Sequence, residues 1–316
     1  MEKYLIITGG VGGAKLALGL SKVLEGEQLH FAVNTADDFT HLGLNICPDI
    51  DTLMYTLSGE SNIEQGWGRK NETWQFMDAL NQLGEQSWFN LGDRDLSVHI
   101  TRTHKLGAGN SLTQITRELY AQFGIPGSVY PMSDDPVSTM VETEAGTLSF
   151  QHYFVKEQCA PKVKGFRFEG VAKAVLNPGI KQLLQDGDLR GVILCPSNPY
   201  VSIDPMLALP GMRSLLHNCA APVIAISPII SGRAVKGPTA KIMQELSIPG
   251  SAEAIANHYS DFLDGFVLDS SDSGLENAVE RLGLSAFTTQ TLMVTLDDRI
   301  QLAEACLDFI NTLHRS

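Results

Sequence analysis

Closely spaced cysteines and histidines are missing from this sequence. The cysteines lie far apart, and none belongs to a C-x-x-C pair; they are Cys47, Cys159, Cys195, Cys219 and Cys306. The histidines include no H-E-x-x-H arrangement. The spacing therefore indicates neither a disulfide framework nor a zinc site, and it predicts reduced thiols, most of them buried.

Basic clusters and long apolar runs are also missing. The formal net charge is -13 and no block is rich in Lys and Arg, so nucleic acid is not an expected partner. No apolar run approaches the ~20 residues that a membrane-spanning helix needs. The absence of a G-x-S-x-G elbow disfavours hydrolysis through an acyl-enzyme. We expect a cytoplasmic protein that binds neither membranes nor nucleic acid.

Short runs of apolar, often β-branched residues alternate with helical patterns along most of the chain. This alternation is typical of an α/β fold, here a Rossmann-like, mostly parallel sheet with helices on both faces. The expected strands are 4–8, 29–34, 127–131, 191–195, 222–227 and 265–268. Residues 147–155 resemble a further strand, preceded by a hairpin-like segment at 141–146. A closing helix is expected over 296–313, where apolar residues recur at helical spacing.

The pattern changes between residues 47 and 123, where helical apolar spacing is joined by polar connections. We interpret 47–123 as a largely helical insert that contributes to the active site. Residues 1–46 and 124–316 then form a Rossmann-like nucleotide-binding core.

A glycine-rich turn that carries a lysine follows the first expected strand, over Gly9–Lys15. Such a turn presents backbone N–H groups and a helix N-terminus to an anion, so it predicts a phosphate ligand. It is not a Walker A loop, because Ala14 and Leu16 stand where that motif needs glycine and a hydroxyl. Nicotinamide binding is disfavoured, because Asn34 stands where an acidic ribose partner is expected. The alternative is that the glycines only permit a tight turn.

Four carboxylates follow the second expected strand, namely Asp37, Asp38, Asp49 and Asp51. Parallel sheets bind ligands at the carboxyl ends of their strands, which is where these side chains should lie. Mg²⁺ takes one or two carboxylates, several waters and a substrate phosphate, so we expect it here with Asp51 and Asp38 as ligands. Asp37 and Asp49 are interpreted as caps of turns or helices.

Two further polar segments are candidate binding sites. Asp93-Arg94-Asp95 places an arginine between two acids, either as a surface ion network or as a group held to meet a phosphate or a ring carbonyl. Ser197 and Asn198 follow the strand at 191–195 and offer donors to a nucleotide. Lys236 and Lys241 could add positive charge, although proline-punctuated turns explain the same segment.

Taken together in their order along the chain, these motifs resemble the 2-phospho-L-lactate transferase family of coenzyme F420 biosynthesis. The matching segments include Gly9–Lys15, Asn34–Asp38, Pro48–Thr52, Leu91–Asp95, Pro131–Thr139, Pro196–Pro199 and Leu209–Arg213. The resemblance implies a Mg²⁺-dependent phosphotransferase that moves a phospholactyl, phosphoenolpyruvyl or phosphoglyceryl group from a guanosine diphosphate conjugate. The acceptor would be the ribityl hydroxyl of the deazaflavin Fo (7,8-didemethyl-8-hydroxy-5-deazariboflavin), GMP would leave, and F420-0 or an analogue would form. The resemblance also implies a homodimer, which is usual in that family.

The resemblance also implies roles for individual residues. Asp51 and Arg94 would be catalytic, the first as a Mg²⁺ ligand that faces the Fo hydroxyl and the second as a contact to Fo or to the reacting phosphate. The remaining implied substrate-binding residues are Gly10, Gly12, Gly13 and Lys15 at the diphosphate, Ser197 and Asn198 at the guanosine, and Asp93.

A nucleotide-sugar-binding regulatory protein of a related family is the alternative, because that family shares the glycine loop and the sheet. Asp51 together with the Gly92–Asp95 turn favours the enzyme, since a pure binding protein would not need them. The sequence leaves open which three-carbon acid the donor carries, because a few contacts can set such a small difference.

Overall fold

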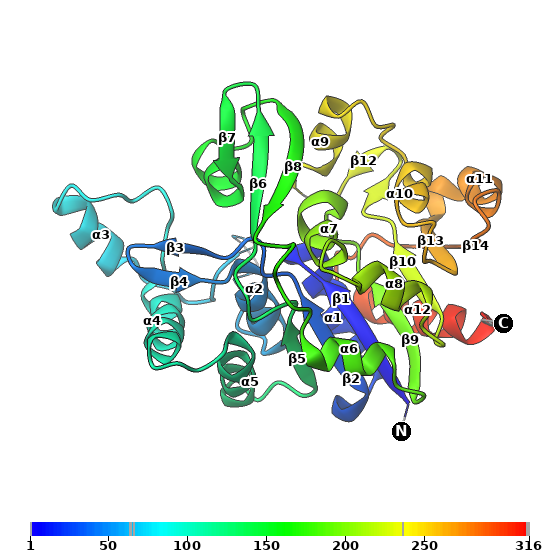
Figure 1. The fold of residues 1–316 in the computed structure, drawn as a ribbon, viewed down its shortest axis with the longest axis horizontal. Helices are drawn as coiled ribbons and strands as arrows, with labels where there is room; N and C mark the ends of the chain where they lie inside the picture. Colours follow the sequence, from blue (N-terminus) through cyan, green and yellow to red (C-terminus); the bar gives the residue numbers. More distant parts are fainter. Residues whose placement is uncertain (1, 63–64, 66, 236, 314–316) are drawn as a thin grey trace.

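The central sheet has seven parallel strands in the order β14-β13-β10-β9-β1-β2-β5. The computed structural model describes residues 2–62, 65, 67–235 and 237–313 (Figure 1). The strands are β1 (Lys3–Thr8), β2 (Leu29–Val33), β5 (Ser128–Pro131), β9 (Leu189–Leu194), β10 (Val223–Ile226), β13 (Gly265–Asp269) and β14 (Ser285–Thr289). All six expected strands are present, which confirms the Rossmann-like α/β fold.

Helices cover both faces of this sheet, as the side chains of β1 show. Tyr4 and Ile6 belong to one apolar cluster, Leu5 and Ile7 belong to the other, and all four are buried. Since successive side chains of a strand point to opposite faces, both faces are covered. The Tyr4 face packs against α1 (Gly10–Val23), α2 (Pro48–Leu57), α5 (Leu112–Gln122) and α12 (Leu296–Thr312). The Leu5 face packs against α6 (Pro178–Leu184), α7 (Asp204–Leu207), α8 (Met212–His217), α9 (Thr239–Glu245), α10 (Ala252–His258) and α11 (Glu276–Glu280).

Helix α12 confirms the predicted closing helix, and it crosses α1 at very close range. A Cβ atom on Gly19 of α1 would lie 2.5 Å from the carbonyl carbon of Arg299 in α12 and closer still to its oxygen. Backbone atoms of a packed helix cannot move aside as a flexible side chain can. A residue without a side chain is therefore needed where the two helices cross.

Smaller elements stand outside the central sheet (Figure 1). They include two hairpins, β3 (Phe39–His41) with β4 (Leu44–Ile46) and β11 (Ile229–Ile230) with β12 (Arg233–Ala234), and the antiparallel sheet of β7 (Gly146–Ser149), β6 (Ser138–Thr143) and β8 (Val163–Glu169). The helices among them are α3 (Gln75–Gln82) and α4 (Asp93–Gly107), the short 3₁₀-helices η1 (Gly26–Gln28) and η4 (Ser270–Leu275), and the short π-helices η2 (His152–Lys156) and η3 (Pro199–Ile203). Figure 1 shows α3 and the β3–β4 hairpin extending away from the central sheet, and β6, β7 and β8 forming a separate projection. In the part of the chain described, no helix is long and apolar enough to cross a membrane.

The segment 47–123 contains α2, α3, α4 and α5, as the helical pattern predicts. Two of these helices, α2 and α5, share an apolar cluster with α1 and the central sheet. The division into a core of 1–46 and 124–316 and an insert of 47–123 stays a prediction.

The strand expected over 147–155 is wrong beyond residue 149. The pairing of β6 with β7 confirms the hairpin, but the chain then turns into a helical segment that includes η2. Phe150 and Tyr153, three residues apart, are both buried, and a helical turn places them on the same face.

Candidate functional site

The loops after β1, β2 and β9 meet at the carboxyl edge of the sheet, where the sequence places its candidate residues. The Gly9 amide donates to Ser197 Oγ at 3.2 Å, which joins the glycine turn to the loop after β9. A Cβ on Gly12 would lie 2.6 Å from the Pro196 carbonyl oxygen, and one on Gly13 would lie 2.6 Å from Ser197 Oγ. Two of the glycines are therefore required by close packing between these loops, whatever ligand the turn binds.

Asp49 holds the start of the glycine turn. Its Oδ1 accepts from the Gly10 amide at 2.7 Å, and its Oδ2 accepts from Asn34 Nδ2 at 2.9 Å. Burial raises the pKa of Asp49 to about 6, although both of these hydrogen bonds favour the charged form. The expected capping role is thus taken at the N-terminus of α1 rather than on the helix to which Asp49 belongs.

Asn198 and Lys15 also make contacts within the protein. The side chain of Asn198 accepts from the Tyr200 amide at 3.0 Å and caps η3. Lys15 Nζ donates to the Met293 carbonyl at 2.9 Å, in the loop that follows β14. Lys15 is thereby tied to a part of the edge that lies far away in sequence.

The loop that receives Lys15 is anchored by Asp269 at the end of β13. This carboxylate is 7% exposed and accepts from the amide and hydroxyl of Thr291, at 2.8 and 3.0 Å, and from those of Ser271, at 3.0 and 2.7 Å. Burial opposes its charged form, but these hydrogen bonds outweigh burial and lower the pKa of Asp269.

Asp269→Asn is therefore expected to destabilise the fold by about 1–3 kcal/mol at pH 7, because an amide cannot accept from donors on both sides. Since the folded-state pKa lies below the usual value for an aspartate, the carboxylate's contribution is present above that usual value and is lost as pH falls through the folded-state pKa. Urea unfolding measures the difference in free energy of unfolding between Asp269→Asn and wild type, and this difference should be smaller at pH 3 than at pH 7. Exposed Asp297→Asn is the matched control, and a pH-independent difference would contradict the role given to this carboxylate.

Asp51 lies at the centre of a buried charged network between α2 and α4. Its Oδ1 forms an ion pair with Arg102, and its Oδ2 lies 3.6 Å from His99 Nδ1. His99 Nε2 lies 3.3 Å from Asp95 Oδ2, and Tyr55 donates to the other oxygen of Asp95. Asp51, His99 and Arg102 are 5%, 2% and 0% exposed, so little water is available to stabilise their charged forms.

The charges of this network shift one another's pKa values. Burial raises the pKa of Asp51, and the charges of Arg102 and His99 offset part of that rise. Burial disfavours the charged form of Arg102, but the Asp51 carboxylate outweighs it and raises the pKa of Arg102. Arg102 therefore stays charged, and its ion pair with Asp51 is maintained.

Three carboxylate oxygens at this edge are buried and, within the described residues, have no hydrogen-bond partner. They are Asp51 Oδ2, Asp38 Oδ1 and Asp37 Oδ1. Burial raises the pKa of both Asp37 and Asp38 well above the usual carboxyl range, and the neighbouring Asp49 adds to the rise at Asp37. Bound cations favour the charged form of such groups, so the unpartnered oxygens of Asp51 and Asp38 fit a Mg²⁺ ion.

A hollow of about 440 Å³ opens beside Asp37 and Asp38. Its lining includes Asp37 and Asp38 after β2, Asp134 after β5, and Phe150 beyond β7. A hollow of this size can accept part of a small-molecule substrate.

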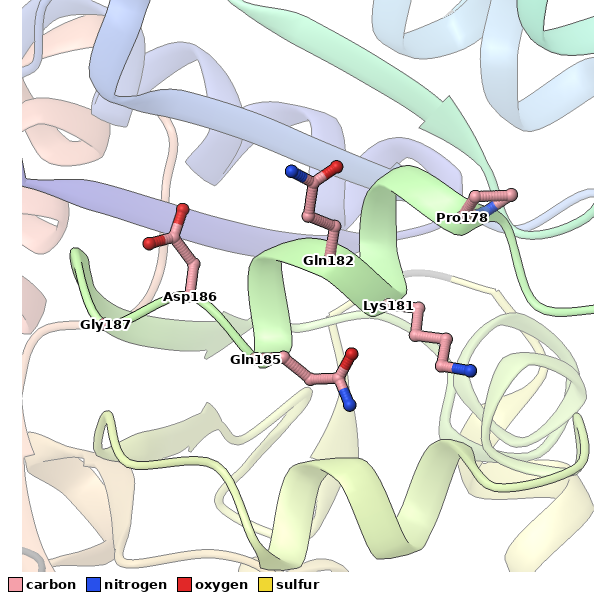
Figure 2. A pocket seen from close by; sticks show the side chains of 6 residues that line it. All are labelled: Pro178, Lys181, Gln182, Gln185, Asp186 and Gly187. Carbon is pink, nitrogen blue, oxygen red and sulfur yellow. The ribbon is translucent and has the colours of Figure 1, made fainter.

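A second hollow, of about 490 Å³, lies along α6. Figure 2 shows its lining side chains on α6 and on the turn that leads to β9, among them Lys181 and Asp186. Asp186 pairs with Lys3 at the start of β1, at 2.6 Å. Asp186 therefore lies near the amino end of β1, and none of the residues that line this hollow is a predicted site residue.

The side chains of the predicted Asp93-Arg94-Asp95 turn contact different parts of the protein. Arg94 donates to the Lys70 carbonyl at 3.0 Å and to Glu60 at 3.3 Å, with a side chain 41% exposed. Asp93 accepts from the amides of Gln75 and Phe76 and from the Thr73 hydroxyl, so it caps the N-terminus of α3. Asp95 alone of the three joins the network around Asp51.

His99 and Arg102 were not among the predicted site residues. Together with Asp95 they recur at spacings of four and three residues along α4, which places all three on one face of the helix. This spacing is a signal that the sequence carries, but only the structure shows that the face meets Asp51.

Of the two lysines proposed to add positive charge, the structure describes Lys241, and its role toward a substrate stays a prediction. Lys241 pairs with Glu245 at 2.6 Å and donates to the Pro161 carbonyl at 3.1 Å. Lys236 lies outside the described residues.

Comparisons with known proteins identify the family of this chain. The family model described as "2-phospho-L-lactate transferase CofD" matches residues 5–303. The 2-phospho-L-lactate transferase of Methanosarcina acetivorans is 40% identical over 98% of this chain and 99% of its own length. The phosphoenolpyruvate transferase of Streptomyces griseus subsp. griseus is 36% identical over 97% and 98%.

A solved structure shares the fold. A UPF0052-family protein from Bacillus halodurans aligns with a TM-score of 0.63 at 14% identity, covering 97% of this chain and 99% of that chain. At such low identity the likeness concerns the fold alone. The match over nearly the whole length, with relatives near 40% identity, shows that this chain belongs to the 2-phospho-L-lactate transferase family of transferases.

Proposed function

We propose that this protein transfers a phospholactyl-type group from a guanosine diphosphate conjugate to the ribityl hydroxyl of Fo, in coenzyme F420 biosynthesis. The hydroxyl oxygen forms a bond to the phosphorus of the phospho-acid, the bond from that phosphorus to the bridging oxygen breaks, and GMP leaves with that oxygen. The hydroxyl proton passes to solvent. The product is a phosphodiester, F420-0 or its phosphoenolpyruvyl or phosphoglyceryl analogue.

The observation that carries the proposal is that a buried oxygen on each of Asp51 and Asp38, at the carboxyl edge, accepts no hydrogen bond within the described residues. In a transferase of this family, such oxygens suit a divalent cation. Asp51 and Asp38 would hold Mg²⁺, which when bound offsets the negative charge of the diphosphate. Displacement at phosphorus needs positioning and charge neutralisation more than a covalent nucleophile.

The other residues of the edge would bind the substrates. We assign Gly10, Gly12, Gly13 and Lys15 to the diphosphate, Ser197 and Asn198 to the guanosine, and Arg94 to Fo or the reacting phosphate. Their present contacts are with the protein itself, so Lys15 and Arg94 would exchange the Met293 and Lys70 carbonyls for substrate. Asp93 would act on substrate only indirectly, through the position of Arg94 beside it.

The test combines purified protein, Fo and Mg²⁺ with each of the three guanylylated phospho-acids separately. We expect a new deazaflavin-fluorescent product on chromatography and an equal amount of GMP with at least one donor. Comparing turnover among the donors identifies the three-carbon acid. If no donor yields product, the proposed function is wrong.

We also propose, from the family resemblance, that the protein is a cytoplasmic homodimer. Light scattering after size exclusion should give twice the mass of one chain across a tenfold range of concentration. A mass equal to one chain at every concentration would contradict the dimer.

A further inference from the structure

Arg102 is the largest fully buried side chain of the described protein, and it carries a charge. It reaches from α4 to Asp51 on α2, where it pairs with Oδ1. Its other terminal nitrogen donates to the Asn45 carbonyl of β4 at 3.2 Å. Two contacts on one planar fork fix the direction of the guanidinium and therefore the plane of the carboxylate it holds.

We propose that Arg102 is a positioning residue for Asp51: by holding Oδ1, it leaves Oδ2 as the oxygen that faces a cation. Asp51 Oδ2 is buried and, in the described part of the protein, accepts no hydrogen bond. The inference deepens the proposed function and rests on it, since Asp51 is the Mg²⁺ ligand there.

His99 contacts both members of this ion pair. Its Nδ1 lies 3.4 Å from Arg102 Nη1 and 3.6 Å from Asp51 Oδ2, and its Nε2 lies 3.3 Å from Asp95 Oδ2. By distance alone, Asp51, Asp95 and His99 could hold a metal ion. Because the two nitrogens face different carboxylates, however, the ring itself bridges the acids, and an ion between them would displace it. The cluster is better understood as a support for Asp51.

Stability alone does not account for this arginine. A buried ion pair is often no more stabilising than apolar residues of the same volume, because both charges lose their hydration. The same pair orients a functional oxygen, which an apolar residue cannot do. Metal-binding side chains are commonly oriented by hydrogen-bonding residues that do not themselves touch the metal, and Arg102 would act in this way on Asp51.

The test uses Arg102→Met, which keeps most of the volume but removes the fork, and Arg102→Lys, which keeps the charge. Exposed Arg190, at the amino end of β9, supplies the matched control Arg190→Met. Arg102→Met should lower kcat about 10- to 100-fold and raise the Mg²⁺ concentration for half-maximal activity about tenfold, as losses of such outer partners do. The KM for Fo should change less than about threefold, because Arg102 does not contact the substrate and its loss removes no substrate-binding interaction. Arg102→Lys should recover part of both losses.

A folded Arg102→Met protein with wild-type kcat and Mg²⁺ requirement would overturn the inference. So would equal losses in the methionine and lysine variants without any change in Mg²⁺ requirement, since that result indicates a purely structural role. If the wild-type protein is inactive with every donor, the proposed function fails, and crystal structures of the wild type and Arg102→Met decide the inference separately. A displaced Asp51 carboxylate supports it, and an unmoved one contradicts it.

Discussion

Asp51→Asn is expected to lower turnover about 10³-fold or more, as the loss of a group that stabilises charge at a reacting centre does. The amide keeps the shape of the side chain but carries no charge for Mg²⁺. Asp38 would then be the one remaining proposed ligand, and it is not paired with Arg102. The measurement is formation of fluorescent product at saturating Fo, donor and Mg²⁺.

The same substitution leaves the Arg102 charge buried without its carboxylate, so the fold should be retained but less stable, by about 3–5 kcal/mol. Kinetics must be measured below the melting temperature of the variant. Adding Arg102→Met to Asp51→Asn removes the stranded charge and should restore stability without restoring activity. The exposed Asp297→Asn variant controls for the loss of one negative charge. Turnover within tenfold of wild type in folded Asp51→Asn would remove Asp51 from the metal site.

Gly19→Ala is expected to destabilise the fold by about 3 kcal/mol, at the upper end of what overpacking costs. The added methyl group would lie 2.5 Å from the Arg299 carbonyl carbon and closer to its oxygen. Both are backbone atoms of α12, so α1 and α12 must separate or bend to admit it. Chemical denaturation followed by circular dichroism measures the change.

Gly107→Ala is the matched control, because it makes the same chemical change at the end of α4. There a Cβ atom would meet nothing within 4 Å. Its effect should stay within about 0.5 kcal/mol of wild type, as is usual for exposed positions. If both variants unfold alike, the close crossing of α1 and α12 is wrong.

The central sheet could be predicted because its inner strands carry their own signal. Buried on both faces, β1 and β9 read as continuous apolar runs, and each ends in a turn rich in glycine or proline. Edge strand β14, over Ser285–Thr289, is half-exposed and mixes hydroxyls with one aromatic residue. It has neither an apolar run nor strict alternation, so its sequence resembles a loop.

The candidate site could be predicted in part. Its position follows from topology, since loops after parallel strands gather at one edge. The hydrogen-bond and ion-pair partners of its residues cannot be predicted from topology, because they come from distant segments of the sequence. Asp49 meets Gly10 across 39 positions, and Arg102 meets Asp51 across 51. Local spacing reveals the face of α4 that carries Arg102, but not the helix which that face contacts.

The order of the strands has a consequence for how the protein is made. β1 is synthesised before its neighbours but lies in the middle of the sheet, and its partner β9 begins only at Leu189. The groove on α1 around Gly19 stays uncovered longer, until α12 has been synthesised. The apolar surface of α1 that α12 covers in the folded protein therefore stays exposed in the nascent chain until α12 docks.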